Sequence, residues 1–209
     1  MTKDEKIAKL GKEITDRATV LLGKDKITPD APEYLGINSA LKFTAVKYDE
    51  KMADDILDIA LTMKKRVPLT IEQLAKKNPQ FDRAYLEKAL QALSESGLVE
   101  FHWENLDGKN PNHEKRWVLD MFVPGSAEIM MINPEQSDMF PETADFFERM
   151  AYLPLAGITE MVPPGGAGIG MHVIPVEKAI PAESKSLPIE HLSHWLKKYE
   201  GHIGVSVCS

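Results

Sequence analysis

The fold is decided by the stretch of residues 70–103, which reads TIEQLAKKNPQFDRAYLEKALQALSESGLVEFHW. Thr70 followed three residues later by Gln73 is a capping box, in which each side chain satisfies a backbone N–H that the first helical turn leaves unpaired. This pattern predicts a short helix over 70–77. Pro79 ends it, because a proline ring clashes with a preceding helical turn.

A second helix follows within the same stretch. Asp82 is a good N-terminal cap, and Ser96-Gly97 marks the end. Its apolar residues lie on one stripe at helical spacing: Leu86, Leu90 and Leu93. From residue 98 onward apolar and polar residues alternate, which predicts a strand over 98–103.

The flanking sequence completes one supersecondary unit. A helix is predicted over 51–65, with Met52, Ile56, Ile59 and Met63 at near-helical spacing. A polar turn at Asp107-Gly108 leads to a second strand over 116–123, where Trp117, Leu119, Met121 and Val123 alternate with other residues. Three helices followed by a hairpin are typical of a winged helix. We expect Trp103 and Trp117 to be buried where this wing meets the helices.

The N-terminal segments are less distinctive. Residues 3–23 carry an apolar stripe and end at Gly23, which predicts a helix. Residues 24–39 contain two prolines and Gly36, and we interpret them as a connecting loop.

Beyond the wing, residues 127–132 form a short apolar run and are interpreted as a strand. A helix is expected to start at Pro141. Six prolines between 154 and 188 exclude a long helix there, and extended pieces are expected instead. A final helix is predicted over 188–199. The chain is therefore predicted to be α+β, with an N-terminal helix and linker (1–39), a winged-helix domain (40–124) and an irregular α/β segment (125–209).

Composition excludes several classes of protein. No run approaches the roughly 18 apolar residues of a membrane span, so we expect a cytoplasmic chain without membrane contact. The formal net charge of -7 argues against broad affinity for nucleic acid. The single cysteine, Cys208, excludes an internal disulfide framework.

Charge also tests the winged-helix interpretation. Residues 51–123 hold eleven lysines and arginines against twelve aspartates and glutamates, whereas a DNA reader normally has a basic face. The helix after Asp82 offers Arg83 and Gln91 as base readers. The wing adds four further cationic or titratable residues: Lys109, His113, Lys115 and Arg116. A docking module is favoured over a DNA reader, and both hypotheses stay open.

The glycine-rich segment 163–170, PPGGAGIG, is a candidate for phosphate contact. Gly166 and Gly168 fit the first half of a dinucleotide fingerprint, but the third glycine position falls on Met171. A tight or flexible loop is the favoured interpretation. Contact with a neighbouring flavin or cluster domain is the alternative.

Four residues near the end could ligate zinc: His191, His194, His202 and Cys208. Their spacing matches none of the common zinc patterns, and surface histidines on a helix are usually solvated. We find no arguable catalytic triad or Cys/His pair, so a hydrolase is not expected.

Two segments carry a family resemblance: IPVEKAIP at 174–181 and LPIEHLSHWLKKYEGHIGVSVCS at 187–209. They resemble the N-terminal region of large anaerobic oxidoreductases, which join ferredoxin-type four-iron modules to a pyridine nucleotide-disulfide oxidoreductase domain. The resemblance covers residues 40–209. In that family a Cys-x-Cys-Arg run begins about where Cys208 stands. This chain departs from the pattern because it holds only one cysteine of that run.

The resemblance implies a non-catalytic accessory region of an iron-sulfur and flavin oxidoreductase, with no activity in this chain alone. It implies a 4Fe-4S cluster and FAD only for a longer chain, in which Cys208 would be a cluster ligand. None of these cofactors is expected in this chain itself. The expected partners are other domains of that enzyme or a redox protein, and a homo-oligomer is left open. The alternative function is a winged-helix transcriptional regulator.

Overall fold

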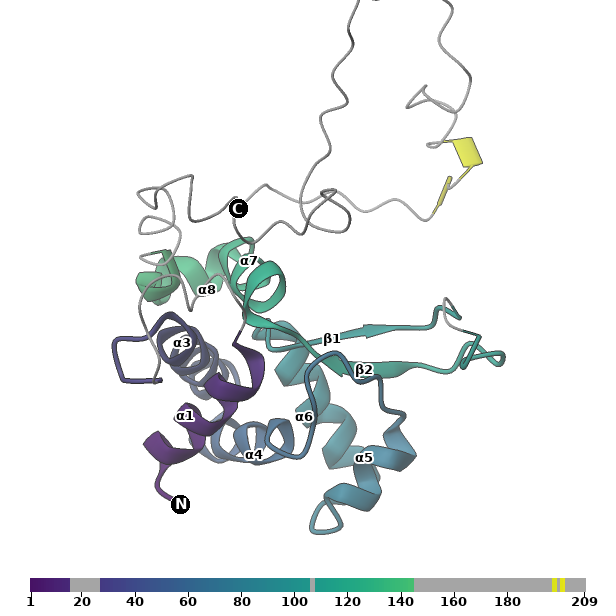
Figure 1. The fold of residues 1–209 in the computed structure, drawn as a ribbon, viewed down its shortest axis with the longest axis horizontal. Coiled ribbons are helices and arrows are strands. Elements are labelled where there is room, and N and C mark those ends of the chain that lie inside the picture. The colour runs from purple at the N-terminus through teal and green to yellow at the C-terminus, as the bar shows by residue number, and fades with distance from the viewer. Residues whose placement is uncertain (16–26, 106–107, 145–196, 199, 202–209) are drawn as a thin grey trace, which may run out of the picture. The chain divides into compact units, whose positions relative to one another are not determined.

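The computed structural model describes residues 1–15, 27–105, 108–144, 197–198 and 200–201 (Figure 1). The chain divides into two compact units, one formed by Met1–Thr159 with Ser209 and the other by Glu160–Cys208. All the elements discussed below belong to the first unit. The predictions for the proline-rich segment 154–188 and most of the final helix lie outside the described residues.

The first unit is rich in helices and carries one small sheet, which confirms a mixed α+β structure. Its larger helices are α1 (Lys3–Ile14), α3 (Pro32–Lys47), α4 (Glu50–Ala60), α5 (Ile71–Lys77) and α6 (Arg83–Glu95). Strands β1 (Val99–His102) and β2 (Arg116–Leu119) form a two-stranded antiparallel sheet. The π-helical turn η1 (Phe122–Ser126), α7 (Ala127–Met131), α8 (Pro134–Met139) and the 3₁₀ turn η2 (Pro141–Thr143) follow.

Helix α3 corrects the prediction of a loop over 24–39. Pro32 occupies its first turn, where the missing N–H is not needed. The helix is buried on several sides, so it lacks the one-sided apolar stripe by which surface helices are recognised. At Gly36 an added Cβ would lie 2.7 Å from the ring of Phe122. The glycine is therefore a packing site within a helix, where the sequence suggested a turn.

The caps predicted for α5 and α6 are confirmed. Thr70 N–H donates to the Gln73 side chain over 2.8 Å, and Gln73 N–H donates to the Thr70 hydroxyl over 3.3 Å. Asp82 accepts a 2.8 Å hydrogen bond from Tyr85 N–H at the start of α6. The helix predicted over 51–65 is shorter, since α4 ends at Ala60.

The segment that joins α4 to α5 pairs with β2. Leu69 and Trp117 exchange two backbone hydrogen bonds of 2.9 Å, and Arg66 N–H donates to Leu119 O over the same distance. These bonds fix the hairpin to the helices, because Leu69 lies directly before the α5 cap. Figure 1 shows the hairpin extending away from the helices beyond this point.

The predicted second strand, 116–123, is too long by four residues, because β2 ends at Leu119. The chain then turns, and Phe122 is fully buried within the helical part of the core. The prediction of a strand over 127–132 is wrong, since Ala127–Met131 is helix α7. Its buried residues Ala127 and Met130 are three apart, which suits a helix and not an alternating strand.

At the N-terminus, α1 is confirmed as far as Ile14, and residues 16–23 of the predicted helix lie outside the described residues. The helical start at Pro141 is present as η2. Sequence analysis missed α8, which Asn133 caps by accepting from Gln136 N–H over 3.3 Å. Within the described ranges, every helix is too short or too polar to cross a membrane.

Candidate functional site

A groove of about 590 Å³ lies between the start of α5, the outward side of α6 and the hairpin. Polar and charged side chains make up most of its walls, and Ile71 and Trp117 are its apolar members. The lining residues are Thr70, Ile71, Glu72, Arg83, Glu87, Gln91, Glu114, Lys115 and Trp117. The groove is thus built from the three elements that the capping box and the hairpin pairing hold together.

The hairpin presents a row of rings on one face. Phe101 and Trp117 are cross-strand partners, with ring centroids 5.2 Å apart at 64°. Trp103 lies two residues beyond Phe101, hence on the same face of the strand, and meets its ring edge-on at 5.4 Å. We call Phe101, Trp103 and Trp117 the aromatic face. Trp117 brings this face into the wall of the groove.

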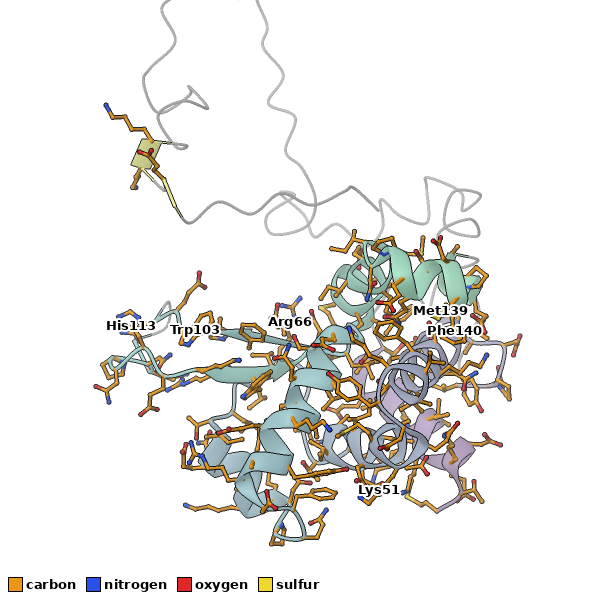
Figure 2. All side chains as sticks on the ribbon, turned by 180° about the vertical axis from the view of Figure 1, so that it is seen from behind. Lys51, Arg66, Trp103, His113, Met139 and Phe140 are labelled. Atoms are coloured by element: carbon orange, nitrogen blue, oxygen red, sulfur yellow. The ribbon has the colours of Figure 1, made fainter. Side chains whose placement is uncertain are left out.

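The two hairpin tryptophans differ sharply in exposure. Trp117 is 4% exposed, which confirms the prediction that it is buried, whereas Trp103 is 51% exposed, so that prediction was wrong. The hairpin extends past the helices before it reaches Trp103, which Figure 2 shows out along it beside His113. Alternation gives the face on which a side chain lies, but not whether another element covers that face.

Lys115 lies over the aromatic face. Its ammonium is 3.9 Å from the Phe101 ring centroid, 4.1 Å from that of Trp117 and 5.8 Å from that of Trp103. An ammonium at such distances is attracted by the negative faces of the rings. In the described part of the chain, Lys115 makes no ion pair with a carboxylate. Its charge is therefore held mainly by the rings.

The hairpin tip is organised by one buried amide. The Asn110 side chain donates to the carbonyls of Trp103, Glu104 and Glu114 at 3.3, 3.2 and 2.9 Å, and it accepts from Glu114 N–H at 3.0 Å. Its full set of partners explains why a polar residue is buried in an exposed loop.

The cationic wing residues named in the sequence are directed largely onto the hairpin. Arg116 donates to the Lys109 carbonyl, His113 Nδ1 lies 3.0 Å from the Trp103 carbonyl, and Lys115 covers the rings. Through these contacts the side chains of Arg116, His113 and Lys115 order the hairpin.

The base-reading candidates of α6 are also engaged. Arg83 contacts Glu72 at 2.8 Å and Glu87 at 3.1 Å, and Gln91 donates to Glu95 at 3.1 Å. The hydrogen bonds to Glu72 and Glu87 raise the pKa of Arg83 further above its ordinary value. A backbone hydrogen bond and the contact with Arg83 lower the pKa of Glu72, so its carboxylate stays ionised at neutral pH. Exposed pairs of this kind are weak and exchangeable.

The sign of the groove's charge follows from its lining. Three carboxylates, those of Glu72, Glu87 and Glu114, face two cations, those of Arg83 and Lys115. The groove thus carries one more negative than positive charge. An excess of negative charge disfavours a phosphate ligand and favours a cationic one.

A second charged cluster lies at the base of the hairpin. The carboxylate of Asp120 is 3% exposed and lies 3.6 Å from the guanidinium of Arg66, which also approaches Glu100 at 3.9 Å. Burial, reinforced by the charge of Glu100, raises the pKa of Asp120 to about 6. A Cβ added at Gly125 would lie 2.7 Å from this carboxyl group, so a glycine is needed there. The cluster is structural, and it does not line the groove.

The other sites named in the sequence lie outside the described residues: Cys208, the three histidines His191, His194 and His202, and the glycine-rich segment 163–170. Among the residues that the structure does describe, no three His, Cys, Asp or Glu side chains are grouped to hold a metal ion. Sequence analysis missed Glu72, Glu114 and Lys115 as members of one site. No local pattern groups them, because Glu72 belongs to α5 whereas Glu114 and Lys115 precede β2.

Comparisons of the chain with protein-family models, with curated proteins and with solved structures find no match.

Proposed function

We propose that residues 40–124 are a winged-helix module that docks a protein partner in the groove and has no catalytic activity of its own. The order of elements supports this interpretation: α4, α5 and α6 are followed by the hairpin, and the segment before α5 pairs with β2. In a winged helix these elements correspond to three helices, a short first strand and the wing.

The observation that carries the proposal is the charge of the surface where such a module would read DNA. The face of α6 beside the hairpin is where base contacts would be made. Here that surface is lined by Glu87 of α6, Glu72 of α5 and Glu114 of the hairpin. Arg83 of α6 is shared between Glu72 and Glu87. Nucleic-acid binding depends on neutralising phosphates with lysine and arginine. An acidic groove that also contains two apolar side chains, Ile71 and Trp117, is better suited to a protein segment.

The partner we propose is a cluster-binding or flavin-binding domain of an oxidoreductase. This part of the proposal rests on the resemblance of residues 174–181 and 187–209. In a longer chain, Cys208 would ligate a four-iron cluster that the partner domain completes, because such a cluster typically takes four thiolates. The accessory module would then bind and orient a redox domain without taking part in electron transfer itself.

A transcriptional regulator is the second candidate, favoured by the placement of α6 beside a hairpin. Fluorescence anisotropy with a labelled pool of random duplexes separates the two functions. At physiological ionic strength we expect dissociation constants no tighter than about 10⁻⁶ M, because the groove repels phosphate.

The matched control is the double variant Glu72→Gln and Glu87→Gln, which keeps the shape of the groove and removes two of its charges. This variant should bind the duplexes more tightly and with a steeper salt dependence. Sequence-selective binding by the wild-type chain at about 10⁻⁹ M would reject the docking function.

A further inference from the structure

The aromatic face already holds a cation, and that cation belongs to the chain itself. Lys115 places its ammonium close to two ring centroids and within 5.8 Å of the third. The stem of Lys115 is flexible, and its ammonium can move without disturbing strand β2, which begins at the next residue. The rings therefore form a preformed cation site with a tethered occupant.

The carboxylate next to this site has no counterion. Glu114 precedes Lys115 in the chain and is exposed, and within the described residues its carboxylate makes no hydrogen bond or ion pair. Only its backbone N–H and carbonyl are used, both by Asn110. The groove thus contains one carboxylate without a described cationic partner, and it belongs to the residue next to Lys115 in the chain.

Displacement of Lys115 by an incoming cation would leave both the rings and the Glu114 carboxylate with a cationic partner. If an incoming ammonium takes the place of Lys115 over the rings, the freed Lys115 can pair with Glu114. The rings keep a cation, and the groove becomes neutral. Rings of this kind attract a guanidinium as well as an ammonium, but the cation held over Phe101 and Trp117 in this structure is the ammonium of a lysine.

We infer that the aromatic face, which adjoins the groove at Trp117, takes up a lysine side chain from a basic segment of the partner, with Lys115 as a displaceable stand-in. This inference rests on the proposed docking function and adds the chemistry of the partner. Trp103, half exposed at the open end of the aromatic face, is the ring that the incoming side chain meets first. Glu72 and Glu87, across the groove, hold further positive charge on the same segment.

The test uses a peptide, acetyl-Gly-Lys-Leu-Lys-Gly-amide, and a matched peptide with norleucine in place of both lysines. Binding to the full chain is followed by the NMR signals of the indole N–H groups of Trp103 and Trp117. We expect the lysine peptide to shift both signals and the norleucine peptide to shift neither.

Three variants separate the ring site from simple charge attraction. Lys115→Ala should tighten binding of the lysine peptide about 3- to 10-fold, since it removes the competing cation. Lys109→Ala removes an equal charge from the same hairpin, six residues before Lys115 in the chain, and should change binding by less than about 2-fold. Trp103→Ala should weaken binding at least about 3-fold, and the circular dichroism spectrum should show that its fold is unchanged.

Equal effects of Lys115→Ala and Lys109→Ala, or unchanged binding to Trp103→Ala, would overturn the inference. The same holds if neither indole signal moves. The docking function is judged separately by whether a partner domain protects α6. If that protection persists in Trp103→Ala with unchanged affinity, docking stands and the lysine site is wrong.

Discussion

The two ends of the hairpin are built by different physical means. At its base, Trp117 is buried and shares two backbone hydrogen bonds with Leu69, so the sheet is part of the core. Toward its tip, Trp103 is 51% exposed, and the loop is held by the hydrogen bonds of Asn110. Both tryptophans lie on one face of one sheet. The base of the hairpin therefore contributes to the stability of the folded chain. The outer part is held mainly by its own hydrogen bonds, and its exposed surface is available for binding.

The largest effect is expected from Trp117→Ala. Removing a buried tryptophan deletes apolar contacts and leaves a cavity, so the free energy of unfolding should fall by about 3 to 5 kcal/mol. Urea unfolding followed by far-ultraviolet circular dichroism measures this loss.

Trp103→Ala is the matched control for that measurement. It removes the same side chain from the exposed end and loses mainly the edge-to-face contact with Phe101, worth about 1 kcal/mol. Equal losses of unfolding free energy in the two variants would show that the core supports the hairpin uniformly along its length. The proposed difference between base and tip would then be wrong.

A smaller effect, dependent on pH, is expected from Asp120→Asn at the base. Asp120 has a pKa of about 6 in the folded chain against an ordinary value of 3.8. The folded state thus binds this proton more tightly than the unfolded state, and Asp120 makes the chain less stable as the pH rises from about 4 to 6. Above pH 6 the ionised, buried carboxylate lowers the free energy of unfolding. The asparagine variant should be more stable than wild type by about 1 to 2 kcal/mol near pH 8.

Near pH 4 the two chains should be almost equal in stability, because Asp120 is then protonated in the folded state. Urea titrations of both chains across this range give the difference directly, and other titrating groups cancel in it. A variant that is less stable than wild type at pH 8 would mean that the contact with Arg66 outweighs the cost of burying the carboxylate.

Much of the fold could be predicted from interactions between residues that are close in the sequence. The Thr70 capping box, the Asp82 cap and the alternation around Phe101 gave α5, α6 and β1, because each depends on neighbours within a few residues. Helix α3 and helix α7 were missed because tertiary burial decided them. The first is buried on several sides, and the second packs only two of its five residues fully into the core.

The candidate site could be predicted only in part. The charged residues of α6 and of the wing could be counted from the sequence, and these counts already argued against DNA binding. Their pairing was not readable, because Arg83 meets Glu72 across eleven residues and two helices. Likewise, the exposure of Trp103 depends on how far the helices extend beneath the hairpin, which no local pattern encodes.

The central claim is that the groove between α5, α6 and the hairpin docks a protein domain. Its most direct test is hydrogen–deuterium exchange of the chain with and without separately expressed cluster-binding and flavin-binding domains of an anaerobic oxidoreductase from the family that residues 174–181 and 187–209 resemble. The account predicts slower exchange over 70–72, 83–91 and 114–117, and unchanged exchange in α1. Unchanged exchange over those three segments, together with protection of the same segments by duplex DNA, would contradict it.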